Sequence, residues 1–139
     1  MPTLTDEQIK EIAEELDCGF RSFYHPKTGE LLFVPDTLRY PDIDIDAWEE
    51  DLEKLENNFT DYKEIKAMKS DDSFQIMADF AQQFDPDESI QRQLISALKT
   101  AKPFREFKFV IDNSDYRQQW FDFKNSSLKE WVMAQIKNI

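Results

Sequence analysis

The chain has 139 residues and a formal net charge of −12 at pH 7, from 29 acidic and 17 basic side chains. Its 40% hydrophobic and 14% aromatic content excludes a disordered chain, and its length fits one domain whose core needs no disulfide or metal. Only two glycines are present, which excludes the glycine-rich loops that bind nucleotide phosphates.

Several features of the sequence predict a cytoplasmic protein that does not enter a membrane. The chain has one cysteine and so forms no internal disulfide. Its first ten residues, MPTLTDEQIK, lack the basic and apolar regions of a signal peptide. The longest aliphatic and aromatic run, LLFV at 31–34, is far shorter than the roughly 20 residues that cross a bilayer.

The chain begins with a predicted helix over residues 5–17. Thr5 and Gln8 have the spacing of a capping box, which typically opens a helix. The apolar side chains that follow have helical spacing and form one narrow stripe. These are Ile9, Ile12, Ala13 and Leu16.

A small antiparallel sheet of about three strands is predicted over residues 20–68. Two strand-like stretches flank the turn-forming residues 26–29, which indicates a hairpin. Residues 36–60 predict a loop and a short helix. The alternation of polar and apolar residues over 62–68 predicts the third strand.

Residues 70–138 predict four helices. Asp85, Pro86 and Glu88 have the pattern of an N-cap, a first-turn proline and a capping-box acid, so they predict the start of the second of these helices. Pro103 opens the third. The expected architecture is therefore α+β, with the sheet and the helices packed around one core in a single domain over residues 1–139.

The aromatic spacing in the second half of the sequence resembles a known family. The segments are PFREFK at 103–108, YRQQWFDFK at 116–124 and LKEWV at 128–132, with IKAMKSDDSFQIMADF at 65–80. Together they resemble a bacterial family catalogued as uncharacterised protein family 0158, over nearly the whole chain. The resemblance implies no reaction, cofactor or catalytic residue.

Charge is distributed unevenly along the chain. Residues 1–60 hold 16 acids and 5 bases, whereas residues 61–139 hold 13 acids and 12 bases. Between Asp36 and Asp61 ten acids are accompanied only by Arg39 and Lys54. This stretch is typical of a solvated surface, and a binding face for a basic partner is the other interpretation.

A metal-dependent nuclease is the enzyme alternative. Asp42, Glu64 and Lys66 match the loose carboxylate-and-lysine pattern of a large nuclease superfamily. Two carboxylates could hold Mg²⁺, while the lysine stabilises charge or orients water. The hypothesis requires these three side chains to converge around one cleft. Otherwise Glu64 and Lys66 are solvent-facing charges on an edge strand.

Two other patterns fall short of a site. Residues 42–46 (DIDID), followed by Glu53, imitate the ligand spacing of a calcium loop, but Ala47 replaces the glycine that its turn needs. The lone His25 cannot form a multi-histidine metal site, and its spacing to Ser22, Ser73 and Cys18 selects no catalytic triad. Cys18 is expected to be a buried or boundary thiol.

The C-terminal helices combine basic and aromatic residues. Their basic side chains recur every three residues, which makes nucleic-acid binding a second alternative. They are Lys99, Lys102, Arg105 and Lys108. The interleaved aromatic residues, which are Phe104, Phe107, Trp120 and Phe123, have the helical spacing of a core instead of a stacking platform. Phe109, Phe121 and Val132 lie off the apolar stripes and are expected to leave apolar surface for a partner.

These patterns favour a non-catalytic protein-interaction or accessory domain. We predict no catalytic, cofactor-binding or metal-binding residue, and no cofactor. The expected partner is another protein or a second copy of the chain, in preference to nucleic acid. The nuclease with Asp42, Glu64 and Lys66 remains the enzyme alternative.

Overall fold

The computed structural model describes residues 4–137, which pack as two compact units. Unit 1 contains the chain up to Ala67 together with the residues from Lys129 onward, and unit 2 contains Met68–Leu128. Each unit is described by itself. The single-domain organisation expected from the sequence stays a prediction.

Unit 1 begins with helix α1 (Asp6–Asp17), as predicted. The Thr5 hydroxyl accepts a hydrogen bond from the Gln8 amide at 3.1 Å, and the Gln8 side chain accepts one from the Thr5 amide at 3.0 Å, so the capping box is confirmed. All four residues of the predicted stripe are buried. The helix ends at Asp17, and Gly19 follows its C-cap with a φ of +91°, which glycine adopts at little cost.

The sheet has three antiparallel strands in the order β2-β1-β3. They are β1 (Phe20–Tyr24), β2 (Leu31–Pro35) and β3 (Lys63–Ile65), and Phe23 is paired with Leu32 on one side and Glu64 on the other. Strand β3 is shorter than predicted because the backbone of Lys66 bonds to side chains of helix α6 (Arg117–Lys137) instead. Its carbonyl accepts from Trp131 and Gln135, each at 2.7 Å.

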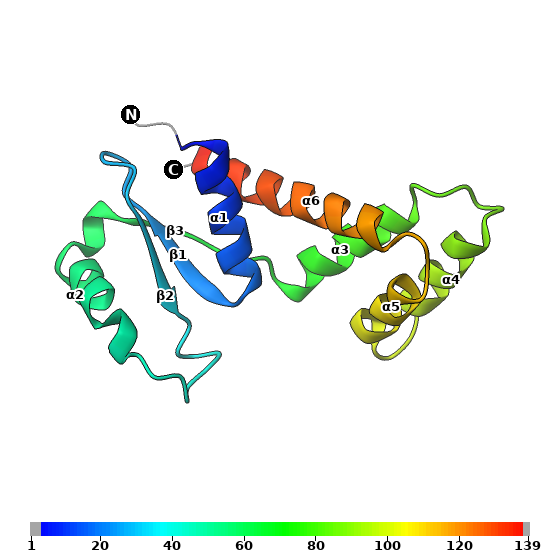
Figure 1. Cartoon of the computed structure of the whole chain (residues 1–139), viewed down its shortest axis with the longest axis horizontal. Coiled ribbons are helices and arrows are strands. Elements are labelled where there is room, and N and C mark those ends of the chain that lie inside the picture. The colour runs from blue at the N-terminus through cyan, green and yellow to red at the C-terminus, as the bar shows by residue number, and fades with distance from the viewer. Residues whose placement is uncertain (1–3, 138–139) are drawn as a thin grey trace. The chain divides into compact units, whose positions relative to one another are not determined.

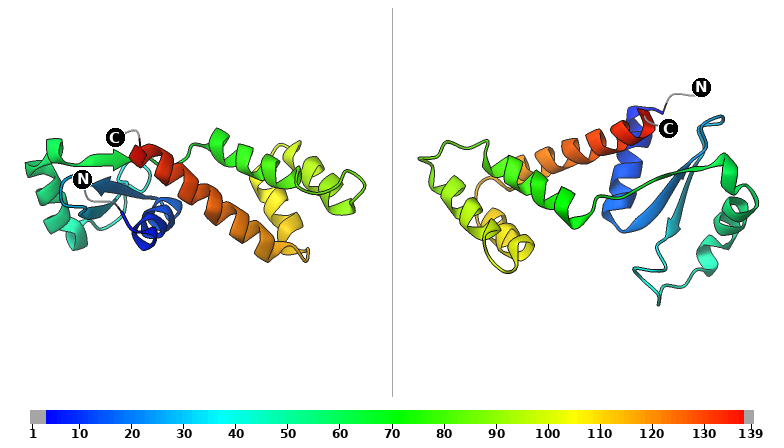
Figure 2. Two further views of the ribbon diagram at one scale, coloured as in Figure 1. Left: turned by 90° about the horizontal axis from the view of Figure 1, so that it is seen from above. Right: turned by 180° about the vertical axis from the view of Figure 1, so that it is seen from behind.

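Helix α1 and helix α2 (Glu49–Asn57) lie on opposite sides of the sheet (Figures 1 and 2). A hydrophobic cluster fills the α2 side and contains Phe23, Leu32, Val34, Leu55 and Tyr62. The predicted loop and short helix are the 3₁₀ turn η1 (Asp46–Trp48), helix α2 (Glu49–Asn57) and the 3₁₀ turn η2 (Phe59–Asp61).

Unit 2 is helical, as predicted. It contains α3 (Ser70–Ala81), α4 (Ser89–Leu98), α5 (Pro103–Asp112) and the first part of α6 (Arg117–Lys137), and α4 packs against both α3 and α5. A hydrophobic cluster joins these helices. Its fully buried members include Phe80, Leu94, Phe107 and Ile111, with Trp120 and Phe123 of α6 partly buried against them.

Helix α4 begins at Ser89, later than the expected start at Asp85 and Pro86. The Arg92 guanidinium donates to the carbonyl of Asp87 at 2.9 Å and to that of Pro86 at 3.5 Å. These bonds hold both carbonyls in a turn outside the helix. A proline and an acid in sequence therefore mark the turn before the helix instead of its first turn.

Two predictions of exposure in the C-terminal helices are wrong. Val132 was expected to be free for a partner but is fully buried, because it lies in the part of α6 that belongs to unit 1. Phe104 was expected in the core but is 45% exposed, since Phe107 and Ile111 occupy the buried face of α5. Phe109 and Phe121 are exposed, as predicted.

The α+β fold class, with an N-terminal helix, a three-stranded sheet and four C-terminal helices, is confirmed. Among residues 4–137, no helix combines the length and the apolar character needed to cross a membrane.

Candidate functional site

The stretch from Asp36 to Asp61, here called the acidic segment, exposes apolar side chains among its carboxylates. Leu38 is 96% exposed and Phe59 68% exposed, and Tyr40 and Ile45 are exposed as well. The Asp36 carboxylate accepts from the amides of Leu38 and Arg39 at 3.2 and 3.3 Å, so a carboxylate-stabilised turn holds Leu38 in water. Burial of these side chains by a partner would be favourable.

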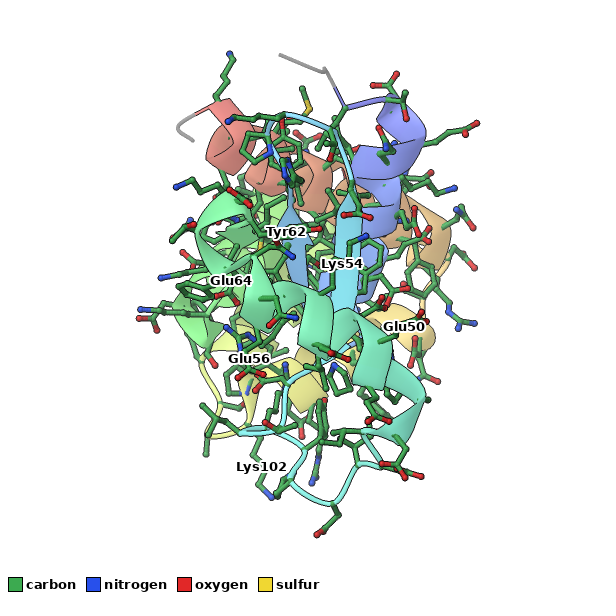
Figure 3. All side chains as sticks on the ribbon, turned by 90° about the vertical axis from the view of Figure 1, so that its left-hand side faces the viewer. Glu50, Lys54, Glu56, Tyr62, Glu64 and Lys102 are labelled. Carbon is green, nitrogen blue, oxygen red and sulfur yellow. The ribbon has the colours of Figure 1, made fainter. Side chains whose placement is uncertain are left out.

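A second polar group, here called the Glu30 cluster, lies at the edge of the sheet and joins it to α2. The Glu30 carboxylate accepts hydrogen bonds from the Lys54 ammonium of α2 and from the Tyr62 hydroxyl. The Tyr62 ring packs edge to face on His25, with centroids 5.1 Å apart. Figure 3 looks onto α2 in front of the strands, with Lys54 and Tyr62 labelled.

Two groups of the Glu30 cluster, Glu30 and Tyr62, have pKa values shifted away from neutral pH. The Lys54 and Tyr62 hydrogen bonds lower the pKa of Glu30, and the Lys54 charge adds to this effect. Burial, together with the Glu30 carboxylate, raises the pKa of Tyr62 to about 12. A general acid or base needs a pKa near the working pH, so these shifts suit a structural ion pair instead.

We expect one of the four tyrosines to titrate at about pH 12, measured by phenolate absorbance. Tyr62→Phe should remove this transition. Glu30→Gln should lower the pKa of Tyr62 but leave it above the ordinary value of 10.0, because burial is the largest cause of the shift. Glu56→Gln is the matched control and should leave it unchanged. An unaltered transition in Glu30→Gln would contradict the contact.

The raised pKa of Tyr62 makes the stability of the fold depend on pH in the alkaline range. The pKa of Tyr62 is higher in the folded protein than the value of 10.0 expected in the unfolded chain. The stability that depends on the neutral phenol is therefore fully present below pH 10 and is lost as the pH rises toward 12. Tyr62→Phe should make unfolding insensitive to pH over that interval, apart from the contributions of other groups.

Glu64, a proposed ligand of the nuclease hypothesis, pairs with Arg21 of β1. The guanidinium donates to both carboxylate oxygens, at 3.0 and 2.9 Å, and lies 5.1 Å from the centre of the Phe23 ring. This hydrogen bond raises the pKa of Arg21. The carboxylate is thus engaged by a cation in the geometry that bidentate pairs favour.

The other two candidates of that hypothesis are exposed. Asp42 lies in a turn between β2 and η1, and Lys66 follows β3. Over residues 4–137, no hydrogen bond or ion pair joins Asp42 to Glu64 or Lys66. Nor do three acidic, cysteine or histidine side chains group to hold a metal ion anywhere in that range, the calcium-like residues 42–46 included.

His25 structures the hairpin turn. Its Nδ1 accepts from the amides of Lys27 and Thr28 at 3.2 and 3.3 Å. The Ser22 hydroxyl is fully buried without a hydrogen-bond partner in the described part of the chain, and strand alternation places it on the opposite face from Phe23 and Tyr62. No contact brings Ser22 and His25 together there.

Cys18 and the basic residues are at the surface. Cys18 is exposed, contrary to the expectation of a buried or boundary thiol, because it caps α1 one turn after Glu14 on the polar side of that helix. The predicted basic series is also exposed. Lys99 follows α4 as its C-cap, Lys102 precedes α5, and Arg105 and Lys108 lie on α5.

The chain matches one known family. The model of the Uncharacterised protein family (UPF0158) matches residues 2–138. The chain belongs to this family. The resemblance predicted from its aromatic segments is therefore confirmed, and membership in UPF0158 assigns no reaction. No curated protein and no solved structure matches the chain.

Sequence reasoning missed the Glu30 cluster. Its members come from the end of the hairpin, from α2 and from the residue before β3, and Glu30, Lys54 and Tyr62 have no motif spacing. The one available signal was chemical, since Tyr62 falls in the predicted strand 62–68 and a buried tyrosine hydroxyl usually finds a hydrogen-bond partner. Sequence alone does not say which of the many acids supplies it.

Proposed function

We propose that this UPF0158 protein is a non-catalytic, cytoplasmic protein-interaction module that binds a basic protein partner through the acidic segment. The observation that carries the proposal is the exposure of Leu38, Tyr40, Ile45 and Phe59 among ten carboxylates. A partner that covered these apolar side chains would remove them from water, which favours binding. The single cysteine is consistent with a reducing compartment.

The two kinds of side chain have different roles in this proposal. The carboxylates attract a basic partner over a distance and accelerate its association, an effect that salt screens. The apolar side chains supply the contact energy, because full burial of a leucine or phenylalanine contributes about 1.5–3 kcal/mol. Binding should therefore slow with salt while still depending on Leu38 and Phe59.

The test is affinity capture of partners from a lysate of the source organism, followed by binding measurements on each purified partner. The Leu38→Ser/Phe59→Ser variant should weaken the affinity for a true partner by about tenfold or more, since it removes two apolar contacts. Phe109→Ser is the matched control, because it changes an exposed phenylalanine in unit 2. It should leave the affinity unchanged.

A separate variant isolates the charge contribution. Asp42→Asn/Asp44→Asn/Asp46→Asn should lower the association rate and reduce its dependence on salt. Capture of the same proteins with equal affinity by all variants would refute the proposal. Saturable binding that needs neither Leu38 and Phe59 nor the carboxylates would place the partner surface elsewhere on the protein and would equally refute it.

A further inference from the structure

Unit 2 has an open groove with an aromatic floor, at a different place from the acidic segment. The groove has a volume of about 620 Å³ and lies between α3, the turn before α4 and the first part of α6. Phe84 and Tyr116 line it and meet edge to face, with ring centroids 4.9 Å apart. Phe80 and Phe123 complete the floor, 5.4 Å apart, and both belong to the hydrophobic packing of the unit.

The rim of this groove is acidic. Glu88 and Asp122 are among its lining residues, which include no lysine or arginine in the described part of the chain. Asp85, Asp87 and Asp115 adjoin the lining residues in sequence and are exposed. The groove therefore presents negative charge above aromatic rings.

The arginines nearest in sequence do not neutralise this rim. Arg92 donates to the backbone carbonyls of the turn before α4, not to a carboxylate of the rim. Arg117 lies over the Phe121 ring and pairs with Asp112 at 3.6 Å. The carboxylate of Asp122 accepts a neutral hydrogen bond from Gln118 at 3.0 Å, so its charge remains available to a ligand.

An arginine side chain has the chemistry that complements such a groove. Its guanidinium is planar, weakly hydrated and able to stack on aromatic rings, and it pairs with carboxylates in bidentate geometry. We propose that the groove binds an arginine-bearing segment of a partner protein, with the guanidinium on the aromatic floor and Glu88 and Asp122 as its counter-charges. This site is independent of the acidic segment and of the function proposed above.

The test is a nuclear magnetic resonance titration of the full chain with a short arginine–leucine peptide at physiological salt. Trp120 packs edge to face on Phe80, which lines the groove, with ring centroids 5.3 Å apart, so its indole N–H signal reports on the groove. The peptide should shift this signal together with the amides of Phe84 and Tyr116. A peptide of the same sequence with citrulline in place of arginine keeps the shape but loses the charge, and it should not bind.

Substitutions distinguish binding of the peptide in the groove from nonspecific attraction to an acidic protein. The Glu88→Gln/Asp122→Asn double variant should lower the affinity for the arginine peptide about fivefold. This is the change expected for a contact of about 1 kcal/mol. Glu130 lies on α6, as Asp122 does, but outside the groove, so Glu130→Gln should leave the affinity unchanged. Thermal unfolding of each variant checks that the fold is retained.

Three outcomes would overturn the proposal. The citrulline peptide could bind as well as the arginine peptide, which would remove the cation from the argument. The double variant could bind as tightly as the parent chain. The peptide could also shift only the signals of residues 36–61, which would assign it to the acidic segment and leave the groove without an arginine ligand.

Discussion

Phe107→Ala is expected to destabilise the protein by about 3–5 kcal/mol, the range typical of deleting a buried phenylalanine. Phe107 is 1% exposed, and its ring packs on Trp120 at a centroid distance of 4.9 Å. Its removal leaves a cavity between α5 and α6 that the surrounding rings can fill only in part. The difference in free energy of unfolding between the variant and the parent chain, measured by urea denaturation, tests this value.

Phe109→Ala is a matched control on the same helix. Phe109 is 65% exposed, so its truncation should change the stability by less than about 0.5 kcal/mol. Both substitutions replace phenylalanine by alanine within α5, so their effects on helix propensity are similar and the difference between them reports burial. Equal costs for the two variants would contradict the described orientation of α5.

Gln91→Met should cost about 1–3 kcal/mol, although methionine has a similar length and is more apolar. Gln91 is only 5% exposed, and its amide donates to the carbonyl of Phe84 at 2.6 Å and to that of Ala81 at 3.2 Å. These carbonyls end α3 and the turn after it. The variant leaves the partly buried Phe84 carbonyl without this donor, and a carbonyl that loses its partner away from water costs stability.

Gln93→Met provides the comparison on the same helix. Gln93 is exposed and bonds to the Ser89 hydroxyl at 3.0 Å, so water can replace its side chain. Its substitution should lie within about 0.5 kcal/mol of the parent stability. If Gln91→Met were as stable as the parent chain in urea denaturation, the two carbonyls would have other partners in solution.

Local patterns predicted the elements well where one physical rule dominates. The capping box of Thr5 and Gln8 is satisfied by bonds within four residues of sequence, so it requires no distant contact. The start of α4 depended on two competing local rules. Asp85 and Pro86 suit either a helix start or a turn, and the side chain of Arg92 selects the turn.

The candidate site was less predictable because its contacts are distant in sequence. The acidic segment is visible as composition, but its exposed Leu38 and Phe59 depend on which apolar side chains the sheet and α2 leave uncovered. The Arg21–Glu64 pair requires the β1–β3 register, and the nuclease pattern could not anticipate that Arg21 would engage Glu64.

The sequence by itself determined the α+β class, the capping of α1, the hairpin and the membership in UPF0158, because periodicity, caps, turns and aromatic spacing are local properties of the chain. Only the tertiary structure decided that Val132 is buried, that Phe104 is exposed and that Glu30 meets Tyr62. Burial and polar pairing depend on which surfaces pack together, and the first and last parts of α6 belong to different units. A single hydrophobic stripe read along that helix therefore cannot predict its buried residues.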